Sequence, residues 1–369
     1  MGKEVISAKQ GIGIGTIYIM GSSLVLGAGS EAEQNVWLAQ LIALLAAVPA
    51  VYVYALILGK YPGKNLFEII ETVFPKIIAQ ILILLYVWYA FHLGALVIRN
   101  FTEFIHVISL PETPKCITAI FMILMCIWAA KAGVETMGRW TLFTLPTVML
   151  FIIIVTFLLA SQFHFENLKP FLNKGLSPVL DSAFSVFSFP FAELVIFLSV
   201  FCHLKEKSTK AIFKAFLWSL LIGGGVLILV SVRTLITLGS HNVSILYFAS
   251  YASVRLISIG GFLERIEVTV SIVFLLGGFI KISICLYTAC KGLARLFNIR
   301  DYRTITAPVG LLMMLLSDLV YRNITEMFEW AIKTYKYYAL PFQVILPILI
   351  LCAAKLKTLA KDKLEMKRT

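Results

Sequence analysis

Long apolar runs recur along the whole chain of 369 residues, and they restrict its fold more than any other feature. Each run holds roughly 17–25 residues, the length that an α-helix needs to cross the hydrocarbon core of a bilayer. By this criterion we expect about ten transmembrane helices, at residues 10–29, 36–59, 77–98, 115–130, 140–161, 179–202, 211–236, 262–290, 304–320 and 338–356. No soluble domain fits between them. The chain is therefore predicted to be a single all-α polytopic membrane domain over residues 1–369.

The composition agrees with this class and argues against an enzyme. Apolar residues make up 60% of the chain and charged residues only 14%, whereas a soluble protein of this length needs far more polar surface. The sequence contains no zinc-binding HExxH pattern, no phosphate-binding loop and no nucleophile elbow. Its six cysteines include no CxxC pair. We expect no catalytic residue, metal site or cofactor.

The positive charge is distributed unevenly among the loops. The net charge is +12, and most of the 32 lysines and arginines lie in the loops and tails on the side of the termini. The positive-inside rule therefore predicts that both termini are cytoplasmic. Because the basic residues are divided among short juxtamembrane loops, anionic membrane lipids are the expected partners, and nucleic acid is not.

The sixth expected span contains a carboxylate and a proline in the middle of apolar sequence, at Phe189-Pro190-Phe191-Ala192-Glu193. An ionisable group inside a membrane is costly and usually functional. The proline removes a backbone donor and interrupts the helix beside it. Such a break next to a charge is typical of transporter ligand sites, so Phe189, Pro190, Phe191 and Glu193 are predicted to bind substrate. The alternative is a proline kink with a structural, hydrogen-bonded glutamate.

The first expected span carries a second interruption signal, Gly21-Ser22-Ser23, at its centre. Glycine lowers helix stability, and Gly-Ser pairs are common at kinks. An unwound turn at Gly21, Ser22 and Ser23 would free backbone N–H groups, which bind anions at the start of a half-helix. The alternative is that these small residues allow membrane helices to pack closely.

The two signals occupy corresponding positions if the ten spans are divided into five and five. Each half has an odd number of spans, so the halves are inverted relative to one another. We therefore expect a five-plus-five inverted repeat with discontinuous first and sixth helices, over about residues 8–162 and 175–356. Paired interrupted helices at equivalent positions predict a binding site near the middle of the membrane.

The third and eighth spans supply further candidates. The eighth opens with Glu264-Arg265-Ile266-Glu267 and contains Lys281 farther along, with Glu267 and Lys281 near one helical face. Glu267 and Lys281 are predicted to act in coupling or gating, with Lys281 in the place of a coupling cation. The alternatives are an interfacial ion-pair cluster and a snorkelling lysine. In the third span, Tyr89 and His92 are predicted to line the site, although His92 also fits a hydrogen-bonded packing role.

Three motifs, in this order and within the ten-span frame, resemble one known family. They are Tyr61-Pro62-Gly63-Lys64-Asn65-Leu66 after the second span, Phe189-Pro190-Phe191-Ala192-Glu193 in the sixth and Glu264-Arg265-Ile266-Glu267 at the eighth. They are similar to signatures of the bacterial spore germination B subunit, the permease-like component of nutrient germinant receptors. That family belongs to the amino acid-polyamine-organocation superfamily, whose fold is a five-plus-five inverted repeat.

The resemblance implies a nutrient sensor in the inner membrane of a dormant spore. It would act with an A subunit and a lipoprotein C subunit, and its ligands would be small amino acids or related nutrients. We expect the ligand carboxylate at Gly21–Ser23 and the ligand amine near the carbonyls of Phe189–Phe191 or Glu193. Two alternatives remain open: a proton-coupled amino-acid secondary transporter working through Glu193 or Lys281, and a channel-like, ion-conducting receptor subunit.

Overall fold

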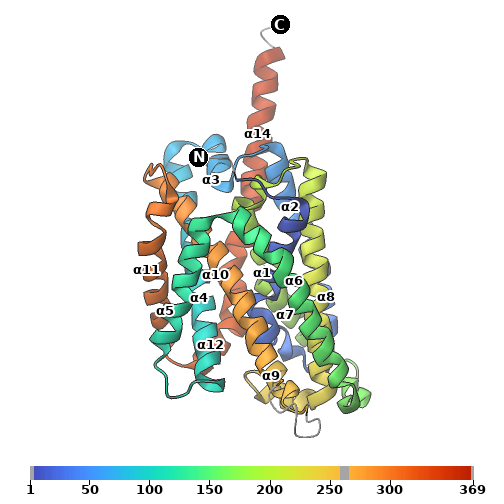
Figure 1. Cartoon of the computed structure of the whole chain (residues 1–369). Coiled ribbons are helices and arrows are strands. Elements are labelled where there is room, and N and C mark those ends of the chain that lie inside the picture. Colours follow the sequence, from blue (N-terminus) through green and yellow to red (C-terminus); the bar gives the residue numbers. More distant parts are fainter. Residues whose placement is uncertain (1–3, 258–265, 367–369) are drawn as a thin grey trace.

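The protein is a bundle of long helices that run along a common direction (Figure 1). The computed structural model describes residues 4–257 and 266–366. Helix α1 begins and α14 ends at the same end of the bundle, here called the terminal end, whereas α9 lies at the opposite end. Within the described ranges, the only extended pairing is a parallel bridge between Ile6 and Leu204. The predicted all-α class is confirmed.

The elements divide into two parts along the chain. The first part comprises α1 (Ala8–Leu26), η1 (Ser30–Asn35), α2 (Val36–Lys60), α3 (Leu66–Val73), α4 (Lys76–Ile108), α5 (Lys115–Ala132), α6 (Val134–Leu158), η2 (Ala160–Gln162) and η3 (Phe165–Leu168). The second part comprises α7 (Ser177–Val186), η4 (Phe187–Phe191), η5 (Ala192–Ser199), η6 (Phe201–His203), α8 (Thr209–Ile245), α9 (Ala249–Val254), α10 (Val268–Leu296), η7 (Tyr302–Thr304), α11 (Thr306–Leu319), α12 (Ile324–Glu329), η8 (Trp330–Thr334), α13 (Tyr335–Leu340), η9 (Pro341–Ile345) and α14 (Leu346–Met366).

Eight helical segments within the described residues are long and apolar enough to cross a membrane. Two further helices, α1 with 19 residues and α11 with 14, lie in the bundle beside them. The number of ten spans and the division into two inverted repeats stay predictions. The predicted tenth span, 338–356, is longer in the structure, because helical structure runs from Ile324 to Leu359.

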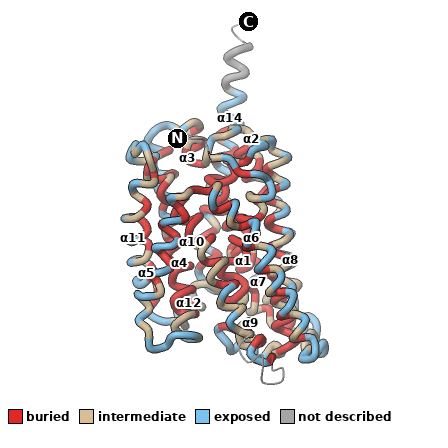
Figure 2. Tube along the Cα trace, in the orientation of Figure 1, coloured by how far each residue is buried: buried red, intermediate tan, exposed pale blue. Residues whose placement is uncertain are grey.

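Helix α1 lies at the centre of the bundle, where it packs against α6, α8 and α10. Its residues from Gly13 to Leu26 are all buried, and Figure 2 shows the buried chain concentrated in the middle of the molecule. A helix that is apolar or small on every side has no face to present to water, so it becomes the core of its bundle.

The lipid-facing surface is formed by large apolar side chains on the peripheral helices. Phe143 and Phe157 on α6 are 78% and 76% exposed, and Ile77 on α4 is 72% exposed. In water such a surface would drive aggregation, whereas the hydrocarbon core of a bilayer solvates it. The exposed apolar side chains and the buried α1 therefore both fit a membrane-spanning bundle.

The end of α1 lies next to an interruption of the sixth span. Helix α1 ends at Leu26, and Gly27 and Gly29 then adopt positive φ angles of 67° and 92°, which glycine tolerates best. The interruption of the sixth span follows α7, where Phe189 leaves helical geometry with φ −135° and ψ 108°. The Ser182 hydroxyl of α7 donates to the Gly29 carbonyl at 3.0 Å, which joins α7 to the segment after α1. The break in the sixth span is where the sequence predicts it, but α1 is continuous from Ala8 to its end at Leu26, without the predicted break at Gly21–Ser23.

Candidate functional site

A salt bridge between Lys281 and Glu193 lies at the centre of the bundle. The Lys281 Nζ atom of α10 is 2.5 Å from Glu193 Oε2 of η5, and both side chains are 0% exposed. Neither atom makes a hydrogen bond with another described atom in addition to this contact. The structure thus brings together two sequence-predicted residues, and the ammonium of Lys281 occupies the position beside Glu193 that was expected for a ligand amine.

Aromatic and amide side chains complete the surroundings of Glu193. The Tyr335 hydroxyl of α13 donates to Glu193 Oε1 at 2.6 Å and lies 3.2 Å from the Tyr89 hydroxyl of α4. Gln343 of η9 donates through Nε2 to Tyr89 at 2.9 Å and to the Ser188 carbonyl at 2.8 Å. The network therefore links three helices to the interrupted sixth span, and together with Lys281 it occupies both oxygens of the Glu193 carboxylate.

Two aromatic rings cover the Lys281 ammonium. The ring of Tyr18 on α1 is 5.2 Å from Nζ, and the ring of Phe189 is 4.7 Å from it. Both distances are within the range of cation–π attraction. The Lys281 chain also lies against α1, because a Cβ at Gly21 would be 2.9 Å from Lys281 Cδ. Lys281 thus sits between the first and eighth spans, as the sequence predicts.

The expected unwinding at Gly21, Ser22 and Ser23 is wrong. Helix α1 is continuous through these residues, and the Ser23 hydroxyl donates to the Ile19 carbonyl at 2.5 Å. Gly277 of α10 approaches so closely that a Cβ on it would be 2.8 Å from the Gly21 Cα. The small residues allow two helix backbones to meet, which was the alternative interpretation. Their N–H groups lie within the helix and are not free for an anion.

Other predicted residues lie away from the ion pair. His92 stacks on Trp88 at 5.4 Å and meets the edge of Tyr338 at 5.1 Å, so it belongs to an aromatic cluster beside Tyr89. Glu267 precedes the first residue of α10 and lies about 21 Å from Lys281 along the helix axis, at 1.5 Å per residue. Residues 264 and 265 lie outside the described residues. The structure therefore does not bring Glu267 and Lys281 together.

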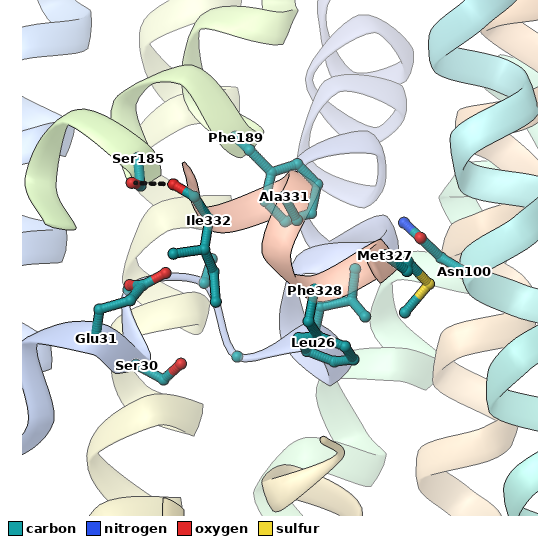
Figure 3. A pocket seen from close by; sticks show the side chains of 13 residues that line it. Leu26, Ser30, Glu31, Asn100, Ser185, Phe189, Met327, Phe328, Ala331 and Ile332 are labelled. Carbon is teal, nitrogen blue, oxygen red and sulfur yellow. Dashed lines mark hydrogen bonds between the residues drawn. The ribbon is translucent and has the colours of Figure 1, made fainter. Parts of the chain in front are cut away.

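A pocket of about 430 Å³, here called the break pocket, opens where the end of α1 meets the interruption of the sixth span. Figure 3 shows Glu31 and Asn100 at opposite sides of it, with Phe328 and Ile332 between them and Phe189 above. Its full lining is Leu26, Gly27, Ala28, Gly29, Ser30, Glu31, Asn100, Ser185, Phe189, Met327, Phe328, Ala331 and Ile332. Phe189 is the one sequence-predicted site residue in this lining. Since its ring also covers Lys281, it separates the break pocket from the salt bridge.

Sequence reasoning missed Glu31, Asn100, Tyr335 and Gln343. Glu31 and Asn100 stand at the ends of expected spans, where polar residues are ordinary. Tyr335 precedes the expected start of the tenth span at residue 338, in sequence that the span pattern leaves outside the membrane. Of these four residues, Gln343 is the one that the sequence could have indicated as a site residue, because it is an amide inside an apolar run.

The bundle has the fold of membrane permeases. The structure resembles Mhp1, a nucleobase-cation-symport-1 family transporter in a closed conformation with bromovinylhydantoin bound, at a TM-score of 0.71 and 12% identity over 95% of this chain and 78% of that chain. It also resembles MhsT in complex with L-phenylalanine, at a TM-score of 0.65 and 12% identity over 96% and 99% of the two chains. At this level of identity the likeness concerns the fold.

Sequence comparison then identifies the family. The family model described as spore germination protein matches residues 5–327, so the chain belongs to this family of spore germination permeases. The chain is 27% identical to spore germination protein KB of Bacillus subtilis (strain 168), over 98% of each chain. It is 26% identical to the putative spore germination protein YfkT of the same strain, over 96% of this chain and 97% of that one. The resemblance inferred from the motifs is confirmed.

Proposed function

We propose that this protein is the permease-like, nutrient-sensing subunit of a spore germinant receptor, and that it binds a small amino acid or related nutrient in the break pocket. The observation that carries this proposal is the lining of the pocket, to which the end of α1 and the interrupted sixth span both contribute. Helix ends and helix interruptions expose backbone groups that can bind a polar ligand away from water.

The chemistry of the break pocket suits an amino acid. Glu31 and the last carbonyls of α1, at the negative end of its dipole, attract an ammonium group. Asn100, 8% exposed, makes no side-chain hydrogen bond to another described residue, so its amide N–H groups are available to a ligand carboxylate. The apolar side chains of Met327, Phe328 and Ile332 would then contact the ligand side chain.

Phe189 can transmit a conformational change from the break pocket to the salt bridge in the bundle centre. It lines the break pocket on one side and lies against the Lys281 ammonium on the other. A ligand shifts a conformational equilibrium only by its difference in affinity for the two states. A nutrient that binds better when Phe189 turns would favour a bundle in which Lys281, Glu193 and Tyr335 are rearranged, and this is the proposed signal.

The proposal also includes the membrane in which the protein acts, its orientation and its partner subunits. The protein would act in the spore inner membrane, with both termini in the cytoplasm and with an A subunit and a lipoprotein C subunit as partners. The basic loops at the terminal end support this orientation through the positive-inside rule. The break pocket, near the opposite end of the bundle, would then face the outside of that membrane.

The test is a dose–response curve of nutrient-triggered germination in spores that carry Glu31→Gln. We expect the midpoint to rise at least about tenfold, which corresponds to about 1.4 kcal/mol of binding free energy. The matched control is Glu33→Gln on the same short helix, because Glu33 pairs with the exposed Lys174 at 2.5 Å and does not line the pocket. Equal midpoints for wild type and Glu31→Gln, at normal abundance by immunoblot, would refute the binding role of Glu31.

One observation favours a second function, proton-coupled secondary transport. Glu193 and Lys281 form a buried pair of ionisable groups, and the fold is shared with transporters. The fixed charge of Lys281 would repel sodium in a low-dielectric site, so coupling would use protons. Saturable amino-acid uptake into proteoliposomes, driven by a proton gradient, would establish transport. Ion current without solute uptake would instead indicate the channel-like alternative.

A further inference from the structure

Arg233 is a buried cation without an acidic partner among the described residues. It lies on α8 and is 4% exposed. Its Nη2 atom donates to the Ser250 hydroxyl of α9 at 3.3 Å, and its Nε atom makes no hydrogen bond. A guanidinium has five N–H donors, so most of its hydrogen-bonding capacity is unused. An unpaired buried charge is strongly destabilising, which makes Arg233 an incomplete site.

The other fully buried arginine provides the contrast. Arg99 on α4 is also 4% exposed, but it lies 3.0 Å from Glu103 and 3.0 Å from Asp318. It donates a further hydrogen bond to the Tyr321 carbonyl at 2.9 Å. Among the described residues, one buried guanidinium thus has two carboxylates as partners and the other has a single hydroxyl. An anion is the partner that would compensate the charge of Arg233.

A separate pocket of about 340 Å³ adjoins Arg233. Arg233, Ser250 and Thr269 are its polar side chains, and the remaining lining is apolar, from α1, α6, α8 and α10. It shares no residue with the break pocket. A larger pocket of about 750 Å³, lined by several hydroxyl side chains, shares residues with both. This polar neighbour favours entry of a soluble molecule over that of a lipid chain.

We propose that Arg233 and Ser250 bind the carboxylate of a small apolar molecule, whose hydrocarbon part fills the rest of the Arg233 pocket. Guanidinium and carboxylate match in a two-bond, charge-assisted geometry, and the Ser250 hydroxyl is the adjacent donor. Binding completes the coordination of a charge that the residues described in the structure leave unpaired. The inference is independent of the nutrient role of the break pocket.

The test uses the full-length protein in phosphatidylcholine nanodiscs, with isovalerate as the probe. Isothermal titration should detect isovalerate binding to the wild type, and thermal unfolding should show a higher midpoint in its presence. The neutral isostere isovaleramide should bind at least about tenfold more weakly. Arg233→Gln should weaken isovalerate binding by at least tenfold, while the exposed Arg255→Gln should leave it unchanged.

Removal of an unpaired buried charge should also leave Arg233→Gln at least as thermally stable as the unliganded wild type. If that variant does not fold, Arg233→Lys is the second test, because lysine keeps the positive charge but cannot form the two parallel hydrogen bonds to a carboxylate. We expect its affinity for isovalerate to fall at least threefold. Equal binding of isovalerate and isovaleramide, unchanged affinity in Arg233→Lys, or displacement of the probe by phosphatidylglycerol in the nanodisc would each overturn the proposal.

Discussion

Lys281 and Glu193 form an ion pair of 2.5 Å, with both side chains completely buried. The attraction between such charges is strong where the dielectric constant is low, but it must offset the loss of hydration of both groups. The hydroxyl of Tyr335 assists by donating to the second Glu193 oxygen. The pair therefore ties α10 to the interrupted sixth span and, through Tyr335, to α13.

The pair predicts a specific pattern of stabilities. Glu193→Gln should lower the free energy of unfolding by about 3–5 kcal/mol, because it leaves the Lys281 ammonium buried without a counter-charge. The double variant with Lys281→Met should recover most of this loss. Thermal unfolding of purified protein in detergent measures both effects.

The same variants test the functional prediction for Glu193. In spores, Glu193→Gln should raise the nutrient midpoint at least about tenfold, or about 1.4 kcal/mol. A normal midpoint at normal abundance would show that the charge of Glu193 has no part in sensing. For stability, additive changes in the free energy of unfolding for Glu193→Gln and Lys281→Met would show that the pair is not energetically coupled.

Close packing between α1 and α10 should make Gly277 intolerant of any side chain. A Cβ at Gly277 would be 2.8 Å from the Gly21 Cα, so Gly277→Ala should cost about 1–3 kcal/mol through overpacking. Gly225→Ala is the control, since nothing lies within 4 Å of its added Cβ. That control should be neutral or slightly stabilising, because alanine is the better helix former. Equal unfolding midpoints for both variants would contradict the packing explanation.

Gln343 should hold the interrupted sixth span in place. Its Nε2 atom donates to the Ser188 carbonyl and to the Tyr89 hydroxyl. Gln343→Leu removes both donors and leaves buried acceptors unpaired, which should cost about 1–3 kcal/mol. The exposed Gln162→Leu serves as the control. Equal thermal unfolding midpoints for Gln343→Leu and Gln162→Leu would rule out this role.

A histidine at the terminal end should make stability depend on pH. His203 lies 3.0 Å from the Tyr287 hydroxyl and 3.7 Å from Glu4. Burial lowers the pKa of His203; Lys291 adds to this effect, while Glu4 and Glu68 oppose it. The unfolded chain therefore binds a proton near the ordinary pKa of about 6.5, before the folded protein does.

This stabilising contribution is present above pH 6.5, the reference value for unfolded histidine, and is lost as pH falls through the lower pKa of the folded state. We expect His203→Gln to show a smaller fall in unfolding temperature than wild type between about pH 7.5 and pH 5. His164→Gln, on an exposed histidine, should behave like the wild type. Parallel pH profiles for wild type and His203→Gln would contradict the prediction.

Hydropathy was sufficient to recognise a polytopic helical membrane protein, because a bilayer imposes the length and apolar character of each span locally. The break at Pro190 was also predictable, since a missing backbone donor interrupts a helix in any context. The three motifs were enough to suggest the family. None of these features depends on which helix lies beside which.

Which residues each side chain contacts is determined by the packing of segments that lie far apart in the sequence. Residues Gly21 to Ser23 can either unwind or stay helical and allow a neighbouring helix to pack closely. The close approach of Gly277 on α10 selects the helical conformation. Glu193 can bind a ligand amine or an internal cation, and the position of Lys281 supplies the cation. Local propensity differs little between such alternatives, so close contact between segments far apart in the chain selects one of them.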